Sequence, residues 1–370
     1  EHAPGQRQHY LDEGSSAPVL MLHGNPSWSY YWRRLVLGLR DTHRCIAPDW
    51  IGMGLSDKPG DAQYRYTLAS RIDELEALYQ HLVAHHGLPT TGLTLAVHDW
   101  GGMIGFGWAV RHPERIARLV VTNTAAFPNP KGRRLPAALR LGRDSALGAL
   151  LIRGFNAFAA GATRHATVRP LAPEVRRAYT APYGSWAHRI ATLRFVQDIP
   201  LGPGDAAWEI VDATARGLHA LAGKPMLIAW GLRDFVFDRA FHDEFLRRFP
   251  HAQDHAYDDA GHYVLEDAHE RIVPVVRAFL ASLSLEQKLA QRIMTAVPGT
   301  VPGDAARKLV VDGGLVGCIV TQQNIVDPAQ LAAYTAGLQA LARGGPTGIG
   351  LLVAVDQEGG RVNRFRSFGT

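Results

Sequence analysis

The sequence predicts an α/β fold, in which helices cover both faces of a mostly parallel sheet. Apolar strand-like runs alternate with amphipathic helical segments over most of the first 283 residues. One of these runs, 93–97, leads through a sharp turn at 98–102 into an apolar helical stretch at 103–110. The segment 128–212 interrupts the alternation and has helical periodicity near 137–160, which predicts an inserted helical cap.

The elements of the core follow from apolar runs and from the residues that end them. Gly87 can terminate the long amphipathic helix 68–86, because glycine adopts a left-handed backbone at little cost. The core is therefore expected to comprise 1–127 and 213–283, with the cap at 128–212 between them. The expected strands are 6–13, 18–22, 44–48, 93–97, 118–123, 224–230 and 251–257, and the expected helices are 30–39, 68–86, 103–110, 239–249 and 266–283.

Asp99 stands at the centre of the sharp turn, Val97-His98-Asp99-Trp100-Gly101-Gly102. Strand, turn and helix form the context of the nucleophile elbow, whose usual form is G-x-S-x-G. At the N-terminus of the next helix, free backbone N–H groups and the helix dipole favour a negative charge. An ionised aspartate there can attack carbon without a base and form an ester, so Asp99 is the candidate nucleophile. The alternative is an aspartate that only caps the helix.

A histidine and an acid at the ends of the last two strands complete the candidate site. His262 lies just beyond the final strand, and Asp234 follows the preceding one. The order nucleophile, acid, histidine is that of the α/β-hydrolase fold. Asp258 and Asp259 are rival acids, although both are close to His262 in sequence, which makes a bond to the far ring nitrogen awkward.

Two residues are candidates for binding an anion in this site. We expect the backbone N–H of Trp100 and one near Asn25 to stabilise a developing negative charge. The indole N–H of Trp100 and the side-chain amide of Asn25 are further donors for a leaving anion.

Four stretches of the chain resemble the haloalkane dehalogenase family of α/β-hydrolases. In that family an aspartate forms an alkyl ester, a histidine-activated water cleaves the ester, and an asparagine and a tryptophan hold the halide. The resemblance implies these roles for Asp99, His262, Asn25 and Trp100, with Asp234 as the acid, and it implies neither a cofactor nor a metal ion. The stretches are His23–Trp28, Asp49–Asp57, Val97–Gly102 and Gly261–Tyr263.

Three further stretches are similar to one branch, the β-lactone decarboxylases of bacterial long-chain olefin biosynthesis. They are Leu147–Phe158, Ala181–Trp186 and Phe195–Pro200, and the whole resemblance covers roughly residues 6 to 282. It implies conversion of a cis-3,4-dialkyl β-lactone to a cis-alkene and carbon dioxide. The apolar side chains of 146–158 are then expected, in part, to line a channel for the alkyl chains of a hydrophobic small-molecule substrate.

Three other functions compete with this interpretation. A haloalkane dehalogenase needs the same residues around the nucleophile, and only the cap distinguishes it. An epoxide hydrolase shares the aspartate but should carry an aromatic residue in place of Asn25, and it uses two cap tyrosines, for which Tyr179 and Tyr183 are available. A non-catalytic binding module should show a broken set of catalytic residues, whereas every member is present.

The segment 284–370 differs from the rest of the chain. A capped helix start at 284–289, strands at 315–320 and 350–355, and a helix at 329–342 predict an incomplete TIM-barrel-like α/β segment. The stretch Asp356–Val362 resembles the substrate-binding motif of family-3 glycoside hydrolases of the β-N-acetylhexosaminidase type, which implies vestigial sugar-binding roles for Asp356 and Arg361. Two catalytic carboxyl groups are needed for glycoside hydrolysis, so we expect this segment to be catalytically silent.

Composition limits the partners and the compartment. Segment 128–212 carries twelve basic and six acidic residues, a net charge of +6 that predicts a basic surface on the cap. This surface could bind other enzymes of olefin biosynthesis, which charge reversal of Arg133, Arg134 and Arg140 would test. Aromatic residues do not interleave with these charges, so nucleic-acid binding is not expected. No apolar run is long enough to cross a bilayer, and Cys45 and Cys318 read as buried thiols of a cytoplasmic protein.

Overall fold

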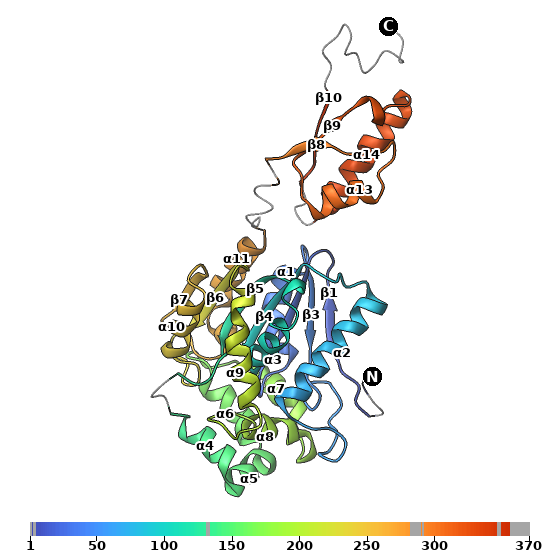
Figure 1. Cartoon of the computed structure of the whole chain (residues 1–370). Coiled ribbons are helices and arrows are strands. Elements are labelled where there is room, and N and C mark those ends of the chain that lie inside the picture. The colour runs from blue at the N-terminus through green and yellow to red at the C-terminus, as the bar shows by residue number, and fades with distance from the viewer. Residues whose placement is uncertain are drawn as a thin grey trace. The chain divides into compact units, whose positions relative to one another are not determined.

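The computed structural model describes residues 2, 5–130, 134–281, 290, 292–345 and 349–355. The chain divides into two compact units, Glu1–Phe279 and Leu280–Thr370 (Figure 1).

A seven-stranded sheet forms the centre of the first unit. Its strand order is β1-β3-β2-β4-β5-β6-β7, and only the edge strand β1 runs antiparallel to its neighbour. β4, the strand that ends in the candidate nucleophile, is central and wholly buried. The predicted α/β fold is confirmed. The strands are β1 (Tyr10–Glu13), β2 (Pro18–Leu22), β3 (Arg44–Pro48), β4 (Leu93–Asp99), β5 (Ile116–Thr124), β6 (Met226–Gly231) and β7 (Gln253–Tyr257).

Helices cover both faces of this sheet (Figure 1). On one face α3 contacts α2 and α9, and on the other α1 and α11 meet where Gly38 faces Val273. The predicted helix 30–39 is divided into a short 3-10 helix and α1. The elements are η1 (Ser29–Trp32), α1 (Arg33–Leu39), α2 (Leu68–His86), α3 (Trp100–Ala109), η2 (Pro113–Arg115), α9 (Trp208–Gly217), η5 (Leu218–Leu221), α10 (Arg239–Arg248) and α11 (Val264–Ala281).

The cap leaves the sheet after β5 and returns before β6. Ser145 caps α5 by accepting a hydrogen bond from the backbone N–H of Gly148, and Asn156, in the left-handed region, separates α5 from α6. Among the described residues no single helix could cross a membrane, although α5 and α6, bent by 80°, pass the same test as a pair. The cap elements are α4 (Ala137–Asp144), α5 (Ala146–Phe155), α6 (Ala157–His165), α7 (Pro173–Thr180), η3 (Ala181–Tyr183), η4 (Ala187–Arg189) and α8 (Ile190–Gln197).

The second unit contains a small parallel sheet of order β10-β9-β8, with Cys318 and Tyr334 in its core. β8 was not expected from the sequence, because its three residues carry no clear alternation. The predicted helix start at 284–289 and the candidate residues Asp356 and Arg361 lie outside the described residues. The elements are β8 (Met294–Ala296), α13 (Asp304–Arg307), η6 (Lys308–Asp312), β9 (Gly317–Val320), η7 (Gln322–Asn324), α14 (Pro328–Gly344) and β10 (Leu352–Val355).

Candidate active site

A cavity of about 570 Å³ lies at the carboxyl ends of the strands, lined by core and cap residues. Ligands of open α/β sheets bind at this end of the strands. Asp99, Trp100, Asn25 and His262 all line the cavity, so four of the predicted site residues are brought together. The rest of the lining is mainly apolar and includes Met103, Phe127, Leu139, Phe158, Val196 and Phe237.

The backbone at Asp99 has the strained conformation of a nucleophile elbow, with φ 51° and ψ −128°. The Thr124 hydroxyl donates a hydrogen bond to the Asp99 carbonyl. Two positions close to the elbow have room only for glycine. A Cβ on Gly24 would lie 2.0 Å from Asp99 Oδ1, and one on Gly101 would lie 2.1 Å from the Leu22 carbonyl oxygen. The turn therefore places the Asp99 carboxylate at the cavity wall.

Burial sets the direction of the Asp99 pKa. It raises the pKa above the ordinary aspartate value, although the charge on His262 and the backbone N–H groups of Asn25 and Trp100 act in the opposite direction. The helix N–H groups therefore favour the charged carboxylate as expected, but burial has the larger effect on its pKa. The backbone N–H of Asn25 donates a hydrogen bond to Asp99 Oδ1 at 2.7 Å. In the structure without substrate, this N–H therefore stabilises the Asp99 carboxylate itself.

His262 lies between the two aspartates. Its Nδ1 is 2.8 Å from Asp234 Oδ2 and its Nε2 is 3.5 Å from Asp99 Oδ2. Burial acts to lower the pKa of His262, but the charge and hydrogen bond of Asp234, together with the charge of Asp99, outweigh it and raise the pKa. This geometry fixes the imidazole with one nitrogen toward the nucleophile, as a triad requires.

The rival acids do not contact His262. Asp258 is exposed, and Asp259 pairs with Arg271 at 2.6 Å. Asp234 is buried instead, and its Oδ1 also accepts a hydrogen bond from the backbone N–H of Val236 at 2.6 Å.

Asn123 holds Asp234 in place, a contact that the sequence analysis missed. Its Nδ2 donates to Asp234 Oδ2 and to the Gly231 carbonyl, both at 2.9 Å, and its Oδ1 accepts from the Gly231 N–H at 2.8 Å. The sequence showed only that 121–125, at the end of β5, lacks a carboxylate. Because Asn123 and Asp234 are 111 residues apart, no local pattern could indicate their hydrogen bond.

The side chains of Asn25 and Trp100 are held by helix α8 of the cap. Asn25 Nδ2 donates to the Thr192 carbonyl at 3.1 Å. The rings of Trp100 and Phe195 contact each other edge to face, with their centres 5.2 Å apart. Phe195 also contacts the buried Arg71, whose guanidinium lies 3.5 Å from the centre of the Phe195 ring. Helix α8 therefore contacts both residues that the sequence suggested as anion donors.

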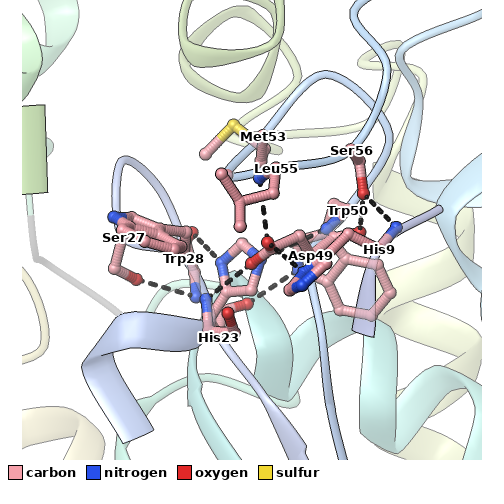
Figure 2. A network of polar contacts seen from close by, with 12 residues as sticks. His9, His23, Ser27, Trp28, Asp49, Trp50, Met53, Leu55 and Ser56 are labelled. Atoms are coloured by element: carbon pink, nitrogen blue, oxygen red, sulfur yellow. Dashed lines mark hydrogen bonds and ion pairs between the residues drawn. The ribbon is translucent and has the colours of Figure 1, made fainter. Parts of the chain in front are cut away.

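A buried polar network supports the loop that carries Asn25 (Figure 2). His23 Nδ1 donates to the Gly24 carbonyl at 2.8 Å, and His23 Nε2 accepts a hydrogen bond from the Trp50 N–H at 3.2 Å. Because one ring nitrogen donates and the other accepts, this imidazole is neutral. Burial correspondingly lowers its pKa. Asp49 receives the Ser29 N–H at 2.7 Å and contacts His9 Nδ1 at 2.8 Å. These hydrogen bonds connect the loop to the turn that follows β3.

The expectation that 146–158 lines the channel is largely wrong. Leu147, Leu150 and Phe155 are exposed, and Ile152 is buried within the cap. Of the side chains expected to line the cavity, Phe158 does so. The apolar content of this stretch was read correctly, but composition does not reveal which face of a helix points inward.

The two cap tyrosines do not line the cavity. The Tyr179 hydroxyl donates to Glu266 at 2.5 Å, and the Tyr183 hydroxyl faces the Met53 sulfur at 3.7 Å. Burial raises the pKa of both. Neither is placed to protonate an epoxide oxygen beside Asp99.

The fold and this arrangement of residues define the class of protein. The family model for the alpha/beta hydrolase fold matches residues 17–269, and the chain belongs to this family. A second family model, for the N-terminal domain of glycosyl hydrolase family 3, matches residues 284–370.

More specific similarities lie within the hydrolase family. The chain is 55% identical over 284 residues to a cis-3-alkyl-4-alkyloxetan-2-one decarboxylase of Xanthomonas campestris pv. campestris, covering 75% of this chain and 93% of that protein. A protein of the same name from Shewanella oneidensis is 52% identical over 277 residues, covering 75% and 86%. A haloalkane dehalogenase of Mycolicibacterium paratuberculosis is 34% identical over 268 residues, covering 70% and 83%.

Solved structures give the same picture of the fold. The haloalkane dehalogenase DbeA of Bradyrhizobium elkani has a TM-score of 0.65 and 29% identity, covering 74% of this chain and 94% of that one. The resemblances drawn from the sequence motifs are confirmed, and the chain is an enzyme of the α/β-hydrolase fold.

Proposed function

We propose that this enzyme decarboxylates a cis-3-alkyl-4-alkyloxetan-2-one, a β-lactone with two alkyl chains, to an alkene and carbon dioxide. The observation that carries the proposal is the Asp99 carboxylate at the wall of a mainly apolar cavity. It is supported by 55% and 52% identity, over 75% of this chain, to proteins named for this substrate. We assign His262 and Asp234 as its triad partners, and Asn25 and Trp100 as donors to the anion that forms.

Attack on the ring carbon C4 gives a balanced route. Asp99 forms a bond to C4, the C4–O bond breaks, and its electron pair leaves as a carboxylate, for which Asn25 and Trp100 are the proposed donors. The C2–C3 bond then breaks and releases carbon dioxide. Its electron pair forms the C3–C4 double bond and expels Asp99 unchanged. Inversion at C4 followed by anti elimination converts a cis lactone to a cis-alkene.

Attack on the ring carbonyl is the alternative first step. It breaks the C2–O bond and leaves a mixed anhydride on Asp99 and an alkoxide on C4, which the same two donors suit. Hydrolysis of that anhydride consumes water and yields a hydroxy acid, and alkene formation still requires the C4–O bond to break. The carbonyl route is therefore less direct, and we favour attack at C4.

Haloalkane dehalogenation is the second candidate function. Asp99 would form an alkyl ester, halide would leave toward Asn25 and Trp100, and His262 would activate the hydrolytic water. The 34% identity to a protein of that name favours it less than the 55% identity to the decarboxylase. Epoxide hydrolysis is further disfavoured, because the cap tyrosines contact Glu266 and Met53 rather than the cavity.

The experiment presents a cis-3,4-dialkyl β-lactone and a 1-bromoalkane of similar length to the same preparation. We expect alkene and carbon dioxide from the lactone, with weak or absent halide release from the bromoalkane. Fast halide release with an untouched lactone would assign the enzyme to the dehalogenases instead.

We also propose roles for the regions of the chain and for its surroundings. Residues 1–127 and 213–283 serve as core, 128–212 as cap, and 284–370 as a segment without catalysis, in a cytoplasmic protein whose Cys45 and Cys318 are buried free thiols. The proposal that other olefin-biosynthesis enzymes bind to the basic cap rests on its charge alone. Of its test residues, Arg133 lies outside the described residues, and the Arg140 side chain is 3.7 Å from Asp144. Unchanged co-purification after charge reversal of Arg134 and Arg140 would refute it.

A further inference from the structure

The exposed face of α5 is entirely apolar. Leu147, Leu150 and Phe155 are 58%, 47% and 72% exposed, and the other exposed residues of this helix are Ala146 and Gly154. A helix at the surface of a water-soluble domain normally turns polar side chains outward. Here the inward face is apolar as well, since Ile152 packs with Leu193 and Val196 inside the cap.

Two apolar side chains from neighbouring elements extend this face. Leu141 of α4 is 41% exposed, and Trp186, before η4, is 50% exposed. A Cβ built on Gly154 would lie 3.3 Å from the Leu150 side chain and 3.9 Å from the Trp186 ring, so the glycine brings these two side chains to one surface. We call Leu141, Leu147, Leu150, Phe155 and Trp186 the α5 patch.

Arginines border the α5 patch. The Arg153 guanidinium lies 4.6 Å from the centre of the Trp186 ring and donates to the Trp186 carbonyl at 3.2 Å. Arg140, one residue before Leu141, has a side chain 71% exposed. Two acids lie near this border. Asp144 contacts Arg143 at 2.6 Å and Arg140 at 3.7 Å, and Asp61 contacts Arg194 at 2.6 Å and acts electrostatically on Arg153. Four arginines therefore stand against two carboxylates, and the net positive charge complements an anionic surface.

The patch adjoins the wall of the cavity along the chain. Ala138, on α4, and Ala157, at the start of α6 two residues after Phe155, are both exposed and both line the cavity. Exposed apolar residues of the cavity lining therefore lie next to the α5 patch in the chain, Ala157 beside Phe155 and Ala138 one helical turn before Leu141.

We propose that the α5 patch is a peripheral docking face for an anionic phospholipid bilayer. Leu and Phe side chains of a helix lying in the interface insert into the acyl boundary, tryptophan prefers the headgroup level, and arginines bind anionic headgroups. Resting on the proposed function, the docked enzyme takes its long-chain lactone directly from the membrane. A protein interface would equally bury aromatic anchors, but the exposed apolar lining of the cavity next to the patch favours a source of lipid-like substrate.

Flotation with vesicles tests the docking without any substrate. The full chain is mixed with phosphatidylcholine vesicles, with or without about one third phosphatidylglycerol, at low and high salt. We expect wild-type protein to float with the anionic vesicles and high salt to weaken the binding. Leu147→Gln should reduce the bound fraction several-fold, and adding Leu150→Gln and Phe155→Gln should abolish it. The matched control is Leu37→Gln on α1, where the leucine is 57% exposed; it should bind as wild type.

Three results would overturn the proposal. Wild-type protein that stays at the bottom of the gradient would do so, and so would equal binding by the triple variant. A triple variant that changes from dimer to monomer in light scattering, without vesicle binding by wild type, would assign the patch to self-association or another protein. Turnover of a short-chain, water-soluble lactone should be unchanged in all variants, which checks folding. If vesicle binding holds while no lactone is turned over, only the proposed function fails.

Discussion

Gly24 limits how the nucleophile can be placed. Because a Cβ at this position would lie 2.0 Å from Asp99 Oδ1, Gly24→Ala must displace either the carboxylate or the loop that carries Asn25. A misplacement of about 1 Å in an active site can cost ~10²-fold in rate, so we expect a loss of about that size in a folded protein. Turnover of the lactone and circular dichroism check it. Gly60→Ala, with open space around the Cβ, is the control, and wild-type activity in Gly24→Ala would contradict the geometry.

Asp234 orients His262, so its amide variant should be the damaging one. Loss of the orienting acid costs up to ~10⁴-fold in the serine-protease example, because the imidazole takes the wrong tautomer. We expect Asp234→Asn to lose several orders of magnitude in kcat, whereas Asp258→Asn and Asp259→Asn stay within about a factor of two of wild type. The assignment is wrong if either of the latter two is the crippled variant.

The predicted site residues could be found because each stands at the end of a strand in a known chain order. Asp99, Asp234 and His262 needed only the strand pattern and a histidine beyond the last strand. Asn123 and Thr192 could not be found, because their roles depend on contacts with residues more than 100 positions away. Asp356 and Arg361 were selected by motif alone and lie outside the described residues.

At the scale of elements, a buried acid on α2 makes stability depend on pH. Burial raises the pKa of Glu74 to about 7, while hydrogen bonds from Tyr64 and the Ile51 N–H act in the opposite direction. Between pH 4.5 and about 7 the folded chain holds a proton that the unfolded chain has released. Stability therefore falls as pH rises through this window, by as much as ~3 kcal/mol.

Glu74→Gln should remove this pH dependence. We expect the loss of unfolding free energy between pH 5 and pH 8 to be smaller in the variant than in wild type. Urea unfolding followed by tryptophan fluorescence measures it, and reports on the first unit alone because all eight tryptophans precede residue 231. An identical loss in both proteins would show that Glu74 is ionised in the fold throughout.

Element boundaries were predictable where a residue ends the element by its own backbone preference. The helix 68–86 was placed correctly because Thr67 caps its start and Gly87, with φ 63°, ends it. The cap was harder. The stretch 146–158 is as apolar as a channel wall would be. The chain bends at Asn156, however, so that α5 lies at the surface and α6 lines the cavity. The direction of a helix face is set by packing, which a pattern does not contain.

At the scale of the whole molecule, the hydrolase should work without the second unit. A shortened chain that ends at Ala281 retains all seven strands of the first sheet and every residue of the candidate site. We expect it to keep the lactone activity of the full chain. The full chain should release no nitrophenol from a nitrophenyl N-acetylglucosaminide. Such release, abolished by Asp356→Ala, would show that the second unit is catalytic.

The central claim is that the Asp99 carboxylate drives decarboxylation of a dialkyl β-lactone. The most direct measurement is the amount of alkene and carbon dioxide formed from a cis-3,4-dialkyl β-lactone by wild type and by Asp99→Asn. We predict equal amounts of the two products from wild type, with the cis-alkene as the hydrocarbon, and a rate lower by several orders of magnitude in the folded variant. Alkene formation by Asp99→Asn at a rate close to wild type, or a hydroxy acid as the main wild-type product, would contradict the account.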